Sequence, residues 1–192
     1  MGAKGSDAGP DKPGVVNIRI DTQYGTPGPH QSVRIRTEPN ADDLEMLLED
    51  IRALRYNKVD TVALPFHSCV IRLPRIIADY QVKVAHAAID AGADPVVCHS
   101  PHIPKAIEVY KGKTIFYSLG VFAMTKPFAW AAPSWTDEPA WAHGAVRNHT
   151  DLDPTYPFMP YGEDCTLSLL AKAQVSREGI ARVSFLPLVF DD

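Results

Sequence analysis

The fold is decided by the stretch GADPVVCHSPH, residues Gly92–His102, in which a helix end, a buried strand and a histidine-rich turn follow one another. Glycine suits the residue that ends a helix, and the short apolar run Pro95–Cys98 predicts a buried strand. An earlier apolar run, Thr61–Phe66, also stops abruptly at a histidine, within the sequence PFHSC. Ligand sites in open α/β sheets gather just beyond the carboxyl ends of the strands. We therefore expect three imidazoles to converge on one crevice, those of His67, His99 and His102.

Length and composition narrow the class of protein. The 192 residues are 45% hydrophobic, which is enough for one globular domain with a real core. The net charge is −4 and no stripe of Lys and Arg is present, so we expect no nucleic-acid partner. No apolar run approaches the roughly 20 residues that span a bilayer, and no signal-peptide pattern is present. As written, the chain is expected to be cytoplasmic, with its three cysteines reduced.

Hydrophobic periodicity predicts two helices near the middle of the chain. Asn40 can cap the first helix, whose apolar stripe runs from Leu44 to Leu54 at helical spacing. The second helix is predicted from about Pro74 to Ala91, with Gly92 placed just past its end. Alternation and turn residues predict an N-terminal pair of strands at Val15–Ile20 and Val33–Arg36, with a turn at Tyr24–His30 between them.

The rest of the chain predicts two hairpins and two segments without periodicity. Ile107–Tyr110 pairs with Thr114–Leu119, and Thr166–Val175 pairs with Ile180–Val189, each across a glycine-containing turn. Residues 1–14 are rich in Gly, Pro and charge and are expected to be disordered. Residues 125–162 form a long loop rich in Pro and Trp. The order helix, strand, helix, strand predicts an α/β fold for residues 15–192.

A set of sequence segments carries a resemblance to a known family. The segments are Ala78–Gln81 (ADYQ), Ile89–Asp94 (IDAGAD), Cys98–His102 (CHSPH), Ile107–Phe122 and Arg182–Pro187 (RVSFLP). Together they resemble the CapA/PgsA proteins of capsule and poly-γ-glutamate synthesis, whose fold is similar to the calcineurin-like metallophosphoesterases. The resemblance covers roughly Asn40–Asp192 and, more weakly, Pro13–Thr37.

What this resemblance implies is a two-sheet α/β sandwich, with two mixed sheets flanked by helices and a metal pair at the strand ends. Only part of that sandwich is expected here, because the family's N-terminal half has no counterpart in residues 1–60. That half carries an early aspartate, a Gly-Asp step and an Asn-His pair, which complete the metal site. Residues 15–192 therefore look like the C-terminal portion of such a protein, and full-length relatives are expected to be membrane-associated.

The candidate site also departs from the family pattern. Family members usually carry His-Trp-Gly where this chain has His67-Ser68-Cys69, and Gly-His-His-Pro-His where it has CHSPH. Ser100 thus replaces one imidazole, and Val121 replaces an asparagine that usually follows Ser-Leu-Gly. The family's metal pair needs more ligands than the three remaining histidines can supply.

The remaining residues predict at most one metal ion. Imidazole suits transition metals rather than Mg or Ca, so the expected cofactor is one divalent ion such as Zn, Mn or Fe. Its expected ligands are His67, His99 and His102, and Cys69 and Cys98 could complete a four-coordinate zinc site. The alternative is that the histidines are remnants bonded to the backbone in a decayed site. For the cysteines, the alternative is that they are small buried hydrophobic side chains.

Two functions follow from this resemblance. In the first, the complete protein has a metal-dependent, hydrolase-type site and takes part in capsule or poly-γ-glutamate biosynthesis. In the second, the chain is a non-catalytic, truncated relative that acts as a binding or partner subunit. The partners expected are an acidic polymer such as polyglutamate, and either a second copy of the chain or the missing N-terminal half. A missing half would leave an open sheet edge and uncovered apolar surface.

Overall fold

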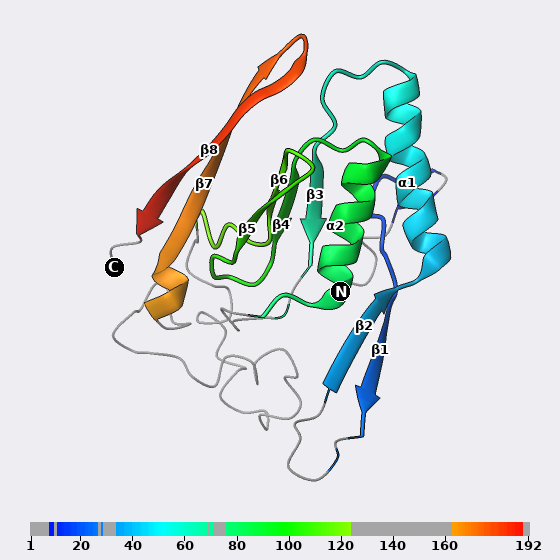
Figure 1. Ribbon diagram of the computed structural model, residues 1–192, viewed down its shortest axis with the longest axis vertical. Helices are drawn as coiled ribbons and strands as arrows, with labels where there is room; N and C mark the ends of the chain where they lie inside the picture. Colours follow the sequence, from blue (N-terminus) through cyan, green and yellow to red (C-terminus); the bar gives the residue numbers. More distant parts are fainter. Residues whose placement is uncertain are drawn as a thin grey trace.

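A computed structural model describes residues 8–9, 11–26, 28, 34–68, 70, 76–123 and 163–189 (Figure 1). Its centre is a four-stranded sheet of order β3-β4-β6-β5. Strands β3, β4 and β6 are parallel, and β5 is antiparallel to β6. The bounds of these strands are β3 Leu64–His67, β4 Val96–His99, β5 Ile107–Tyr110 and β6 Lys113–Phe116. The predicted hairpin of β5 and β6 is confirmed, although β6 ends at Phe116 and not at Leu119.

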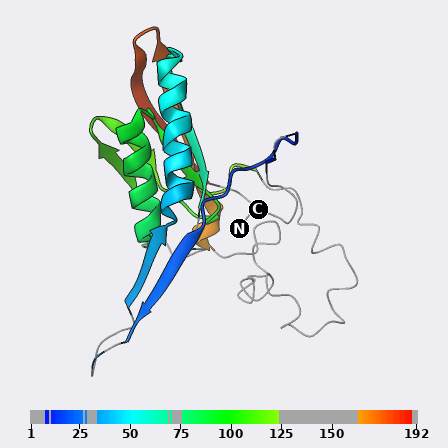
Figure 2. The same cartoon turned by 90° about the vertical axis from the view of Figure 1, so that its right-hand side faces the viewer.

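Two helices lie side by side on one face of this sheet (Figures 1 and 2). Helix α1 spans Ala41–Tyr56, and Asn40 caps it as predicted, its side chain accepting a hydrogen bond from the Asp43 backbone N–H at 3.2 Å. Helix α2 spans Asp79–Ala91 and ends at Gly92, whose φ of 119° is the left-handed conformation expected of a glycine at a helix end. No helix in the described residues is long and apolar enough to cross a membrane.

The predicted start of α2 was wrong. Residues 76–78 are not helical, and Ile76, expected to face inward, is 48% exposed. The physical reason lies in Gln81, whose Oε1 accepts a hydrogen bond from the Ala78 backbone N–H at 3.0 Å. This bond satisfies a backbone donor just before the helix, so the first turn forms at Asp79 and not near Pro74.

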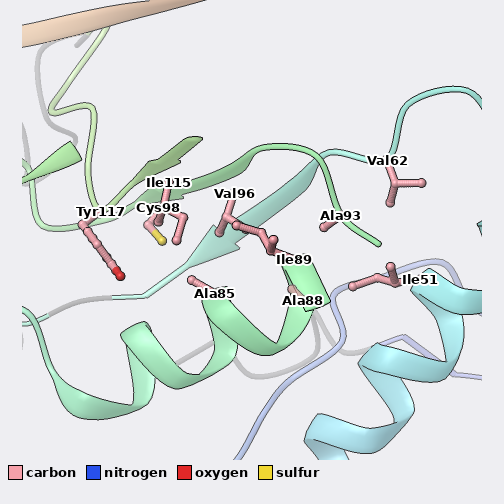
Figure 3. Close-up of a cluster of buried hydrophobic side chains, with 10 residues drawn as sticks. All are labelled: Ile51, Val62, Ala85, Ala88, Ile89, Ala93, Val96, Cys98, Ile115 and Tyr117. Carbon is pink, nitrogen blue, oxygen red and sulfur yellow. The ribbon is translucent and has the colours of Figure 1, made fainter. Parts of the chain in front are cut away.

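The hydrophobic core fills the space between the sheet and the two helices (Figure 3). Alanines at the α2 surface let the helix approach the sheet closely, because they add little volume between the backbones. Val96 and Cys98 of β4 point into this core and are fully buried. The core cluster consists of Ile51, Val62, Ala85, Ala88, Ile89, Ala93, Val96, Cys98, Ile115 and Tyr117.

An antiparallel pair of strands near the N-terminus lies beside α2. Strand β1 spans Ile20–Gly25 and pairs with β2, Arg34–Pro39. The prediction of a strand at Val15–Ile20 was therefore wrong, as was the placement of Tyr24 in a turn. Val15 and Val16, at the start of the predicted strand, are 52% and 57% exposed, so burial does not favour a strand there. The backbone pairing with β2 decides where β1 forms, and that pairing is not visible in local periodicity.

The C-terminal hairpin is confirmed. Strand β7, Leu167–Ser176, pairs with β8, Gly179–Val189, after a short 3₁₀ helix at Glu163–Thr166. One face of this two-stranded ribbon is entirely apolar, and Phe185 and Val189 on it are 48% and 72% exposed. The residues of the apolar face are Leu167, Leu169, Ala171, Ala173, Val183, Phe185, Pro187 and Val189.

The α/β prediction is confirmed, but of the sheets in the described residues only the four-stranded one is mixed, and the others are two antiparallel ribbons. In the part of the chain that the structure describes, strand β3 lies at an edge of its sheet. Among the described residues, no strand pairs with its outer side. The backbone N–H groups of Leu64 and Ser68 point toward β4, where they donate to β4 and its flanking residues. Alternate residues of a strand direct their backbone groups to opposite sides, so the backbone nitrogen of Pro65 faces the outer side of the sheet.

In the stretch 1–14, Gly9 and Lys12 are joined by two backbone hydrogen bonds. The predicted loop 125–162 lies outside the described residues.

Candidate metal centre

His67 and His99 meet at the carboxyl ends of two neighbouring strands. They are the last residues of β3 and β4, and the parallel register places them directly opposite each other. Their Nδ1 atoms lie 3.1 Å apart, and the ring centroids lie 4.8 Å apart with an interplanar angle of 76°. Both side chains are exposed on the face of the sheet opposite the helices. The paired strand ends thus place two imidazoles at one surface position.

The surroundings of His99 disfavour the protonated form of its ring. Partial burial, and then the neighbouring His67 ring, lower the pKa of His99 below its ordinary value. At 3.1 Å, one neutral ring can donate its Nδ1–H to the Nδ1 lone pair of the other ring. A metal ion between the rings would require both Nδ1 atoms to be unprotonated.

The third predicted ligand lies on a turn of unusual backbone conformation. Ser100 and His102 have φ values of 109° and 64°, a region that residues with a side chain rarely adopt. Such conformations cost about 1–3 kcal/mol each and persist only where the surrounding structure holds them. In the described part of the chain, no three His, Cys, Asp or Glu side chains are grouped so that they could hold a metal ion. The structure therefore brings His67 and His99 together and does not join His102 to them in such a group.

Cys98 points away from the histidine pair. Successive side chains of a strand alternate between the two faces, so Cys98 lies in the core beneath α2 while His99 lies on the opposite face (Figure 3). Burial raises the pKa of the Cys98 thiol to about 12, partly offset by a hydrogen bond with Ser68. This placement fits the alternative interpretation of Cys98 as a small buried side chain. Cys69 lies outside the described residues.

A second cluster of titratable groups was not found by the sequence analysis. The His86 ring stacks on Tyr110 with centroids 3.8 Å apart, and its Nε2 lies 2.8 Å from Glu108 Oε1. The buried Tyr117 hydroxyl donates to the other Glu108 oxygen at 2.6 Å. The Tyr117 bond, followed by His86, lowers the pKa of Glu108. This network fastens α2 to β5 and β6, and only the strand register reveals it.

Comparison with known proteins identifies the family. The model of the family described as "Bacterial capsule synthesis protein PGA_cap" matches residues 4–126. The chain belongs to this family. The matched residues include His67, His99 and the turn after β4. They also include residues 4–14, to which the sequence analysis gave no role.

Individual relatives match shorter stretches of the chain. The PGA biosynthesis protein CapA of Bacillus subtilis is 57% identical over 44 residues, which are 23% of this chain and 12% of that protein. The capsule biosynthesis protein CapA of Bacillus anthracis is 52% identical over 42 residues, 22% of this chain and 10% of the relative. A probable polyglutamine synthesis accessory protein of Mycobacterium tuberculosis is 54% identical over 39 residues, 20% of this chain and 10% of the relative. The matched stretches thus span about a tenth of each relative.

Proposed function

We propose that this chain forms part of a capsule or poly-γ-glutamate biosynthesis protein and supplies His67 and His99 to a divalent metal site. The family assignment supports the biological role. The observation that carries the metal site is the separation of 3.1 Å between the two Nδ1 atoms at the ends of parallel strands. The proposed scaffold is a partial calcineurin-like metallophosphoesterase sandwich, for which the mixed sheet with helices on one face supplies one layer.

The geometry of the histidine pair fits two ligands of a single ion. Zinc–nitrogen bonds are about 2.0–2.1 Å long, so two nitrogens on one tetrahedral ion lie roughly 3.3 Å apart. The observed separation of 3.1 Å is close to that value. Zinc, manganese or iron is proposed, because imidazole suits transition metals. When bound, such an ion would act as a Lewis acid and would activate water for hydrolysis.

The remaining ligands must come from outside the pair. His102 lies on the turn after β4, and Cys69 follows His67 by two residues in the sequence. Carboxylates from another polypeptide segment, or from a second copy of the chain, are the other proposed source. The proposed substrate is an acidic polymer such as polyglutamate, and the name of one relative, a PGA biosynthesis protein, supports this choice.

Metal analysis of the purified chain tests this proposal. The protein is prepared with Zn, Mn and Fe available, beside the double variant His67→Ala/His99→Ala and the control His86→Ala. The control removes an imidazole from the cluster with Glu108 and leaves the pair intact. We expect stoichiometric metal in the wild type and in the control, and loss of metal in the double variant. Equal metal content in all three proteins, or metal in none, would contradict the site.

A second candidate function is that of a non-catalytic binding or partner subunit. Two observations favour it: the described residues contain no three-member ligand group, and Cys98 lies in the core. The exposed apolar face of the β7–β8 ribbon would then contact a second copy or a separate N-terminal half. Sedimentation at increasing concentration, with and without polyglutamate, measures both kinds of association. A metal-free chain that associates through Phe185, shown by a Phe185→Ser variant, would support this function over the first.

A further inference from the structure

The segment that follows His67 is tied directly to the other histidine strand. Ser68 is 4% exposed, and its backbone N–H donates to the His99 carbonyl oxygen at 3.1 Å. This bond continues the ladder between β3 and β4 by one residue beyond the assigned strands. The conformation of Ser68 therefore helps to determine where both imidazoles stand.

Gln81 holds Ser68 from the helix side. Its side chain is fully buried in the first turn of α2, and its Nε2 donates to Ser68 Oγ at 2.9 Å. Its Oε1 accepts from the Ala78 N–H at 3.0 Å, so both ends of the amide are used. A buried amide without partners is costly, and this pairing therefore fixes the orientation of the group. Gln81 connects the start of α2 to the residue after His67.

Lys105 holds the same segment through a second set of hydrogen bonds. The residue is 6% exposed, and its Nζ donates to the carbonyl oxygens of Val70 at 2.8 Å and Ile76 at 2.6 Å. Its backbone N–H donates to the Ser118 carbonyl oxygen at 3.1 Å. An ammonium group is expensive to bury unless it is hydrogen-bonded. One residue thus joins the segments that follow β3, β4 and β6, all at the end of the sheet where the histidines lie.

The backbone of the turn before Lys105 needs such support. Ser100 and His102 both have positive φ, and the turn that contains them runs from His99 to Lys105. Strained conformations of this kind persist where neighbouring contacts over-determine them. The anchored Lys105 fixes the far end of the turn, and the Ser68 bond fixes its beginning at His99.

We infer that Gln81 and Lys105 are positioning residues, which hold His67 and His99 at the separation that suits a shared metal ion. This inference rests on the proposed function for its chemical purpose. Its structural content, the dependence of the imidazole pair on two remote side chains, can be measured in the metal-free protein.

The experiment compares Gln81→Met and Lys105→Met with the control Lys113→Met in the full chain. Lys113 lies at the opposite end of the sheet, where its Nζ bonds Asp94 at 2.6 Å, so its loss weakens the fold without touching the histidine segments. Zn²⁺ affinity is measured by competition with a chromophoric chelator, and the ring nitrogens are followed by ¹H–¹⁵N spectra of metal-free protein. We expect Zn²⁺ affinity to fall about 10–100-fold in the two test variants, as for other residues that orient metal ligands. The control should keep the affinity and the ring signals of His67 and His99.

A milder variant keeps the inference testable if a test variant does not fold. Ser68→Ala removes the acceptor of the Gln81 amide, together with the hydrogen bond to the Cys98 thiol, and should shift the ring signals in the same direction. Wild-type ring signals and affinity in the folded variants would overturn the inference. If the wild type itself binds no Zn²⁺, the proposed function fails, and the ring signals alone decide the positioning role: altered signals support it and unaltered signals refute it.

Discussion

Asp94 lies at the end of the sheet opposite the histidines and joins α1, the segment before β3, and β6. Its carboxylate is 3% exposed and accepts hydrogen bonds from the Val62 N–H at 3.0 Å, from Lys113 Nζ at 2.6 Å and from Arg55. Asp94→Asn keeps an acceptor for Val62 but removes the negative charge that faces two cations. Hydrogen bonds to charged groups contribute about 1.5–3 kcal/mol each. Because Arg55 and Lys113 are 29% and 41% exposed, water recovers part of this energy, and we expect a loss of about 2–3 kcal/mol.

Urea unfolding at pH 7 measures this loss, and thermal melting should show a decrease of roughly 5–10 °C. The pH dependence supplies a second check. Burial alone would raise the pKa of Asp94, but the bonds from Lys113, Val62 and Arg55 outweigh it and lower the folded pKa. The wild type therefore holds this stabilisation above the unfolded pKa of about 4 and loses it as pH falls through the folded pKa. The difference between wild type and variant should shrink as pH is lowered from 7 to 3.

The reasoning on Asp94 is refuted by either of two results. A variant within about 0.5 kcal/mol of the wild type at pH 7 would behave as an ordinary surface substitution. A large difference that stays constant with pH would mean that shape, and not charge, stabilises the wild type. Lys111→Met is a matched control, because its ion pair with Asp90 is exposed and should contribute little.

Three further outcomes are expected. Gly120→Ala should lower the free energy of unfolding by about 1–3 kcal/mol, because residue 120 has φ 83° and an added Cβ would lie 2.9 Å from the Leu167 carbonyl oxygen. Wild-type stability in urea would contradict that expectation. Tyr117→Phe should cost about 1–2 kcal/mol in a thermal melt, since the buried hydroxyl donates to Glu108 at 2.6 Å, and an unchanged midpoint would show that the bond contributes nothing. The Cys98 thiol should resist alkylation at pH 8 until the protein unfolds, because burial raises its pKa to about 12, and mass spectrometry that finds rapid labelling of folded protein would oppose this.

Local sequence signals predicted most of the elements, and long-range contacts explain the failures. Asn40 and the apolar stripe after it locate α1, and the glycine-containing turns locate both hairpins, because these signals act within a few residues. Strand β1 was misplaced because its position depends on pairing with β2. Helix α2 was started too early because the burial and bonding of Gln81 depend on Ser68, which belongs to another part of the chain.

The candidate site shows the same difference between local sequence signals, which were predictive, and long-range contacts, which were not visible in the sequence. Two strands that end in histidine, aligned in parallel, place His67 and His99 together, and the sequence pattern was sufficient for this prediction. The positions of Cys98 and Lys105 could not be predicted in the same way. Cys98 precedes a ligand candidate in the sequence but points to the other face of the sheet, which becomes clear only when the register is known. Lys105 reads as an ordinary surface lysine until its two carbonyl partners are seen.

Pro65 determines what can approach the histidine pair from the side of β3. The residue occupies the outer side of that strand, where its ring nitrogen carries no hydrogen to offer a neighbouring chain. A further strand aligned along β3 would leave one of its carbonyl groups without a donor, so growth of the sheet in this direction is disfavoured. The edge therefore resists stacking between copies, as edge prolines do in other sheets. Any polypeptide that completes a metal site here must reach across the exposed face with its side chains and cannot simply extend the sheet.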